Sequence, residues 1–229
     1  MVVLIAAIVA ATGSGCVTMA PPPPMATFGG PETVRRGASE VGLAAGSGGQ
    51  LFPGAHATGH AWFGRWRYGV TDRLDLGVDL MGVQHAADAT VTAKGAARYA
   101  LRPRLRVEAG LGAADDSQGK SLHGDAGVTT GTLRPDATWN FYTSLRAAAA
   151  RGYPGRVCCQ SGATGDAAPP NSIIALGAIG ATARVVPGIR FVVEGGYGPV
   201  WVKGRHDSGE VVYLGMGLLL DVGKTSSTR

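Results

Sequence analysis

The stretch from His60 to Val83 alternates between apolar and polar side chains in two runs joined by a short turn. In the first run one face carries Trp62, Trp66, Tyr68 and Val70. In the second run, after Thr71-Asp72-Arg73, one face carries Leu74, Leu76, Val78 and Leu80. A repeat of two is the period of a β-strand, and about ten residues let a tilted strand cross a bilayer. The stretch therefore predicts a β-hairpin of membrane-spanning length with one apolar face.

The same strand-like pattern recurs along the chain. We expect strands at residues 34–47, 58–70, 74–83, 89–101, 105–114, 121–132, 137–149, 172–185, 189–202 and 209–222. Alternate connections are tight and contain Pro, Gly or Asp, as turns require: Thr71-Asp72-Arg73, Arg102-Pro103-Arg104, Arg134-Pro135-Asp136 and Val186-Pro187-Gly188. The intervening connections look longer. This arrangement predicts an all-β, closed antiparallel up-and-down transmembrane β-barrel of about ten strands, with eight or twelve as alternatives.

Composition fits one such barrel and excludes other classes. Charged residues make up 16% of the 229 residues, and 37 are glycine. Beyond the N-terminus, no apolar run is long enough for a membrane-spanning helix. The formal net charge is +5, but the basic residues are scattered and form no nucleic-acid motif, so we expect no nucleic-acid partner.

The N-terminus has the form of an export signal. Residues 2–11 (VVLIAAIVAA) form a short apolar core, followed by Thr12-Gly13-Ser14-Gly15-Cys16. Small residues directly before a cysteine resemble the lipobox of bacterial lipoproteins. The resemblance implies a signal peptide at residues 1–15 and an acylated Cys16. The alternative is cleavage by the ordinary signal peptidase.

The prolines that follow cannot join a sheet. Residues 16–33 include Pro21–Pro24 and Gly29-Gly30, and proline removes the N–H that a strand needs. We therefore expect residues 16–33 to be the lipid anchor and an extended periplasmic tether.

The end of the chain resembles the closing strand of bacterial outer-membrane β-barrels, which carries the assembly signal. In VVYLGMGLLLDV one face carries Val212, Leu214, Met216, Leu218 and Leu220. The resemblance covers residues 33–222 by pattern, and we expect the barrel at residues 34–222 and a tail at residues 223–229. It implies an integral protein of the Gram-negative outer membrane, with outer-membrane lipids and the barrel-assembly machinery as partners and no cofactor. Aromatic residues fall near the expected strand ends, as membrane girdles require: Tyr68, Tyr99 and Trp139 on the periplasmic side, Trp62 and Trp201 on the outer side.

Turn length predicts which charges meet inside the barrel. A three-residue turn at 71–73 sets Arg65 opposite Asp79, and one at 102–104 sets Arg98 opposite Glu108. A cationic side chain facing lipid costs about 2–4 kcal/mol at the membrane midplane, so these pairs should face the lumen. The same argument places Lys94, Arg106, Asp125, Arg190 and Glu194 inside. We expect a polar, largely plugged lumen, with a selective small pore as the alternative.

The sequence contains few residues in an arrangement that would indicate catalysis. Omptin proteases are ten-stranded barrels with Asp and His at the outer rim. Acidic and histidine residues do occur in the outer connections here, at Asp115-Asp116, His206-Asp207, His85 and Asp88. Their spacing is not the omptin pattern, so we assign no catalytic residue, metal site or cofactor. The adjacent Cys158 and Cys159 in the longest connection suggest a disulfide, within the pair or between molecules.

The sequence thus favours a non-enzymatic outer-membrane β-barrel with a structural, adhesive or ligand-binding role at the cell surface, its ligand unknown. One alternative is a small outer-membrane channel. Another is a soluble periplasmic β-barrel lipoprotein that binds an apolar ligand.

Overall fold

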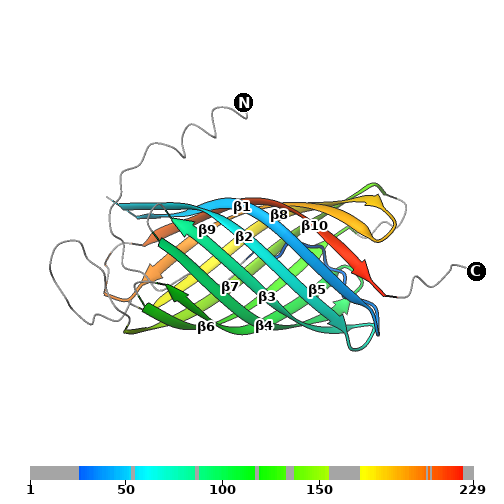
Figure 1. The fold of residues 1–229 in the computed structure, drawn as a ribbon, viewed down its shortest axis with the longest axis horizontal. Helices are drawn as coiled ribbons and strands as arrows, with labels where there is room; N and C mark the ends of the chain where they lie inside the picture. The colour runs from blue at the N-terminus through cyan, green and yellow to red at the C-terminus, as the bar shows by residue number, and fades with distance from the viewer. Residues whose placement is uncertain are drawn as a thin grey trace, which may run out of the picture.

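The computed structural model describes residues 26–52, 55–85, 88–116, 119–132, 137–154, 171–204, 206 and 208–223. These residues form ten antiparallel strands that close into one barrel (Figure 1). The strands are β1 (Ser39–Phe52), β2 (Ala55–Gly69), β3 (Leu74–His85), β4 (Asp88–Arg102), β5 (Leu105–Asp116), β6 (Gly119–Gly131), β7 (Trp139–Pro154), β8 (Ser172–Val186), β9 (Ile189–Val202) and β10 (Gly209–Val222). Each strand pairs with its neighbours in the chain, and β1 pairs with β10. The predicted fold class and strand number are confirmed.

The two ends of the barrel are distinguished by one long connection. We call the end where β1 begins and β10 ends the turn end, and the opposite end the loop end. The longest connection, between β7 and β8, is at the loop end. Three other loop-end connections hold only two residues, at 53–54, 86–87 and 117–118. The expectation that these connections are longer than the turns is therefore wrong, because their strands run further than the sequence pattern indicated.

The register of the hairpins follows from the turns. Val70 donates its N–H to the carbonyl of Leu74 at 2.9 Å, and the β2–β3 pairing places Arg65 across from Asp79. The first strand starts five residues later than expected: β1 begins at Ser39 and not near residue 34, because the residues before it turn into the barrel.

The outer surface of the barrel is apolar on every strand. Large hydrophobic side chains point away from the lumen, including Leu111 and Ile179, which are 76% and 70% exposed. Tyr68, Tyr99 and Trp139 lie near the turn end, and Trp201 lies near the loop end. Trp62 is closer to the middle of β2, because β2 starts at Ala55. The described residues contain no helix long and apolar enough to span a membrane.

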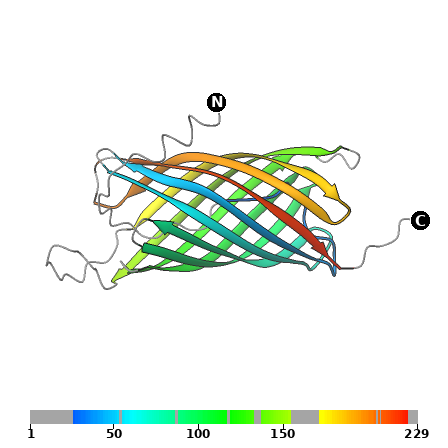
Figure 2. The ribbon, with the colours of Figure 1, turned by 45° about the horizontal axis from the view of Figure 1, so that its top comes forward.

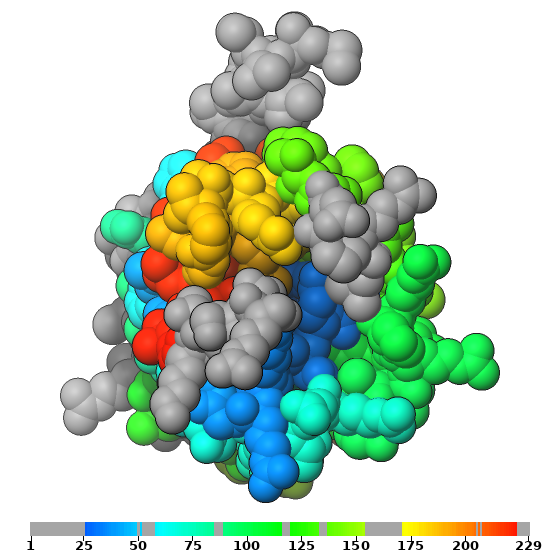
Figure 3. Space-filling model, turned by 90° about the vertical axis from the view of Figure 1, so that its right-hand side faces the viewer, coloured from blue at the N-terminus to red at the C-terminus, as the bar shows by residue number. Residues whose placement is uncertain are grey.

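The residues before β1 fold back into the barrel from the turn end (Figure 2). Gly37 donates its N–H to the carbonyl of Gly69 at 2.8 Å, which fixes the chain where it enters. Thr27 and Phe28 are almost completely buried. In a view onto the turn end, the dark blue atoms of this segment lie inside the ring of strands (Figure 3). The sequence predicts that residues 26–33 form an extended periplasmic tether, but these residues lie inside the barrel. We call residues 26–34 the plug.

Candidate functional site: the lumen and its plug

Charged side chains fill the half of the lumen next to the turn end. The basic ones are Arg65, Arg67, Lys94, Arg98, Arg106, Arg146 and Arg190. The acidic ones are Glu40, Asp75, Asp79, Glu108, Asp125 and Glu194. All but Arg190 are buried. Charges of both signs alternate around the ring, so the buried charges largely compensate one another.

Asp79 is a centre of this network. Its carboxylate accepts from Arg65 Nε at 3.2 Å and from Arg67 Nη2 at 2.7 Å, and Lys94 Nζ lies 3.4 Å away. The structure thus brings together Arg65 and Asp79, the first pair chosen from the sequence. Loss of this one carboxylate would leave three buried cations short of a partner.

Arg98 and Glu108 face each other in register but do not pair with each other. Arg98 Nε instead donates to Asp75 Oδ1 at 2.6 Å, because Asp75 is the residue opposite Arg98 on its other neighbouring strand. Glu108 is held by Arg146 at 2.8 Å. The expected Arg98–Glu108 ion pair is therefore replaced by two others, since each charge lies between two neighbouring strands.

Glycines on the inner face provide room for these long side chains. A Cβ on Gly110 would lie 2.7 Å from Lys94 Cδ, and a Cβ on Gly77 would lie 2.6 Å from Arg67 Cδ. The side chains of the charged network lie across these glycines. Glycine here permits dense packing and does not leave an open channel.

The plug is held by hydrogen bonds between its backbone and the wall. The Thr27 N–H donates to Glu194 Oε1 at 2.7 Å, and the Gly29 N–H donates to the Tyr142 hydroxyl at 3.1 Å. That hydroxyl in turn donates to Glu194 Oε2 at 2.7 Å. Nearer the turn end, the Val34 N–H donates to Asp75 Oδ2 at 2.9 Å.

Two arginines hold the carbonyl oxygens of the plug. Arg65 Nη1 donates to the carbonyl of Phe28 at 3.0 Å, and Arg106 Nη1 donates to that of Gly30 at 2.6 Å. A buried backbone group without a partner is costly. The strands therefore supply partners for an irregular segment that has no sheet of its own.

Phe28 anchors the tip of the plug in an apolar seat. Its ring centroid lies 5.2 Å from that of Phe63 and 6.5 Å from that of Tyr213. A Cβ on Gly215 would lie 2.6 Å from the Phe28 ring, so only glycine fits below it. Phe28 adopts a φ of +34°, a region that bulky residues rarely occupy. The packing of the ring and its carbonyl bond to Arg65 hold this strained conformation in place.

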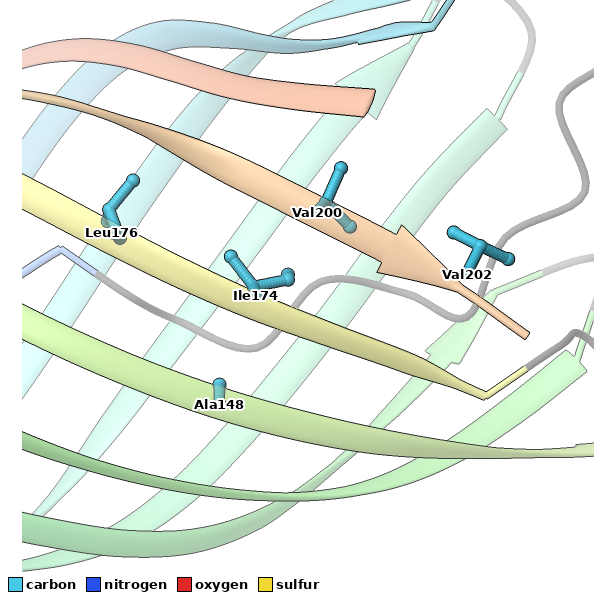
Figure 4. Packing of buried hydrophobic residues seen from close by; sticks show 5 residues of the cluster. All are labelled: Ala148, Ile174, Leu176, Val200 and Val202. Carbon is cyan, nitrogen blue, oxygen red and sulfur yellow. The ribbon is translucent and has the colours of Figure 1, made fainter. Parts of the chain in front are cut away.

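The half of the lumen next to the loop end is lined by apolar side chains on one wall and by polar side chains on another. Its wall on β7, β8 and β9 is apolar and consists of Ala148, Ile174, Leu176, Val200 and Val202 (Figure 4). A cavity of about 120 Å³ continues from the plug into this half, between Ala26, Phe28, Met81, Ile174 and Tyr213. The wall on β4 and β6 is polar. There Thr92 Oγ1, Ser121 Oγ and both ring nitrogens of His123 are buried with no hydrogen-bond partner in the described part of the chain.

The remaining residues singled out from the sequence do not assemble into a site. Asp115 forms an exposed ion pair with Lys120 at 3.5 Å, and His206 is exposed. Cys16, Cys158, Cys159 and Asp207 lie outside the described residues, as do the side chains of His85, Asp88 and Asp116. Over the described ranges, no group of three or more His, Cys, Asp or Glu could hold a metal ion.

Comparison with solved structures finds other β-barrels that resemble this chain only in overall architecture. No protein-family model matches the chain, and no curated protein matches it. Among solved structures, Neisserial surface protein A aligns with a TM-score of 0.44 and 12% identity, over 81% of this chain and 99% of that one. An outer membrane channel from Pseudomonas putida F1 aligns with a TM-score of 0.47 and 11% identity, over 83% and 97%. The outer membrane protease OmpT from Escherichia coli aligns with a TM-score of 0.42 and 8% identity, over 82% and 98%. Similarity this distant carries no argument about activity.

Proposed function

We propose that the protein is an integral β-barrel of the bacterial outer membrane whose lumen is closed by its charged network and its own plug. The observation that carries this proposal is the inverted distribution of polarity. The charges are buried inside, whereas apolar side chains such as Leu111, Leu145 and Ile179 are 65–76% exposed on the outside. A soluble protein rarely exposes so much contiguous apolar surface. A bilayer would cover it, with the turn end in the periplasm.

The closed lumen favours a scaffold over a channel. Arg67, Lys94, Arg98 and Arg106 are at most 2% exposed, and the plug fills the space between them. An ion that crossed this half would have to displace paired charges. The proposed role is therefore structural, adhesive or ligand-binding, with the loop end facing the cell exterior.

The same arrangement supports a non-enzymatic protein. The nucleophiles and bases that an omptin-like hydrolase needs would have to gather at the loop end. There Asp115 is paired with Lys120. In the turn half of the lumen, the charged side chains bind one another or the plug.

Membrane fractionation combined with gel migration tests the proposal. The native protein should co-sediment with outer membranes, resist extraction by carbonate, and migrate differently before and after boiling. Recovery in the soluble periplasmic fraction would contradict the membrane assignment and support the alternative, a soluble barrel lipoprotein. A cleavage activity that is lost on replacing His206 would contradict the non-enzymatic role.

A further inference from the structure

The plug has a direction along the barrel. Its last residue, Val34, is bonded to Asp75 near the turn end, whereas Thr27 is bonded to Glu194 further inside. Ala26 lines the same cavity as Phe63 and Met81. The chain traced from Ala38 back to Ala26 thus runs from the turn end towards the loop end. The residues before Ala26 must continue from a point inside the lumen.

A return to the turn end is blocked. Plug residues 27–31 are buried, and the surrounding charged side chains are nearly all buried as well. No second pass of chain fits between the plug and this wall. Ahead of Ala26, in contrast, lies the cavity of about 120 Å³, which Ala26 itself lines.

We propose that residues 21–25 of this chain occupy the loop half of the lumen, so that the N-terminal region leaves the barrel through the loop end. The chain then threads the barrel from one mouth to the other. The inference concerns the inside of the barrel and does not depend on the membrane assignment.

The chemistry of residues 21–25 suits both walls. Pro21–Pro24 and Met25 carry no charge, and proline has no N–H that would need a partner. Their apolar rings and side chain match the wall formed by Ile174, Val200 and Val202. Their carbonyl oxygens can accept hydrogen bonds from groups on the neighbouring polar wall that have no other partner among the described residues, such as Ser121 Oγ and the His123 ring N–H on β6.

The length of chain is sufficient. From Phe63, which lines the same cavity as Ala26, β2 continues to Ala55 at the loop end, which corresponds to about 20 Å along the axis of a tilted strand. An extended proline-rich chain advances about 3.1 Å per residue, so about seven residues cover this distance.

Site-specific photo-crosslinking tests the path. A small diazirine amino acid replaces Pro22 in the full-length protein, which is illuminated in native envelopes, and the linked peptides are mapped by mass spectrometry. We expect cross-links from position 22 to the loop-half wall at Ile174, Val200 or Val202. Cross-links to the turn-end residues Thr71–Arg73, or to none of the lumen residues, would overturn the proposal.

Matched positions control the experiment. The same amino acid at Ala26 should link to Phe63 or Met81, and at Val212, on the outer face, it should link to neither Ile174 nor Val200. Only material that retains the unboiled migration of the folded barrel is analysed. If the Pro22 variant does not reach that form, Pro24 is the second position, with the same expected and contrary outcomes.

Discussion

Arg65 faces Asp79 across the β2–β3 pair, with Nε donating to Oδ1 at 3.2 Å. The same guanidinium donates from Nη1 to the carbonyl oxygen of Phe28 in the plug, at 3.0 Å. One side chain thus joins the charged wall to the inserted segment. Because both contacts are buried, the stability of the wall and the position of the plug depend on each other.

Replacement of Asp79 by alanine should destabilise the barrel. Arg65, Arg67 and Lys94 would lose a shared carboxylate in a buried site. Removing one partner from a buried ion pair costs about 3–5 kcal/mol, and we expect a loss of that size in the free energy of unfolding. Urea titration of the protein folded in detergent, followed by unboiled gel migration, measures it.

Asp115→Ala is the matched control for that measurement. Asp115 forms an ion pair of similar length with Lys120, but its side chain is 64% exposed. An exposed pair contributes about 0–1 kcal/mol. Equal effects of the two substitutions would show that the buried network adds nothing to stability.

Gly215→Leu should release the plug without changing any charge. A side chain at this position would meet the Phe28 ring, which a Cβ alone already approaches to 2.6 Å. Thr27 is fully buried, so a cysteine placed there reports on release. The test uses the Cys158→Ser, Cys159→Ser variant with Thr27→Cys added. The cysteine at position 27 should not react with a maleimide in this protein, and it should react when Gly215→Leu is also present. Equal labelling with and without Gly215→Leu would contradict the seat assigned to Phe28.

A charge on the outer face should be costly at mid-strand and tolerated at the end of a strand. Leu145, near the middle of β7, is 65% exposed, and Val222, the last residue of β10, is 53% exposed. In a bilayer, Leu145→Arg should lower the unfolding free energy by about 2–4 kcal/mol and Val222→Arg by about 0–1 kcal/mol. Unfolding from lipid vesicles measures both. A neutral Leu145→Arg would indicate that water, and not lipid, surrounds the barrel.

Cys16→Ala tests the proposed lipid anchor. If Cys16 is the acylated residue, the variant should no longer incorporate a clickable fatty acid, whereas the Cys158→Ser, Cys159→Ser variant should incorporate it as the parent does. Labelling that persists in Cys16→Ala would exclude this site.

The sequence predicts the wall of this barrel well, and the reason is geometric. Alternation assigns each side chain to a face, and turn length sets which residues lie opposite, as with Arg65 and Asp79. Ion-pair choice is less predictable: Arg98 lies between Asp75 and Glu108, and only packing decides that it bonds to Asp75.

The plug could not be predicted from the sequence. Residues 26–34 have no periodicity, and their contacts join backbone groups to side chains far along the chain, such as Tyr142 and Glu194. The Pro-rich stretch before them indicates only that no strand forms there. The late start of β1 is the related consequence, because residues 34–38 lead the chain from the plug to the first strand.

We propose a membrane-embedded barrel that is closed by its own charged side chains and plug. Single-channel recording tests it most directly, with the purified, refolded protein in bilayers from which folded, heat-modifiable barrel is afterwards recovered. Because paired charges and the plug fill the turn half of the lumen, we predict no steady current steps above the protein-free baseline. Reproducible single-channel steps from the wild-type protein would contradict the closed lumen and identify the protein as a small channel.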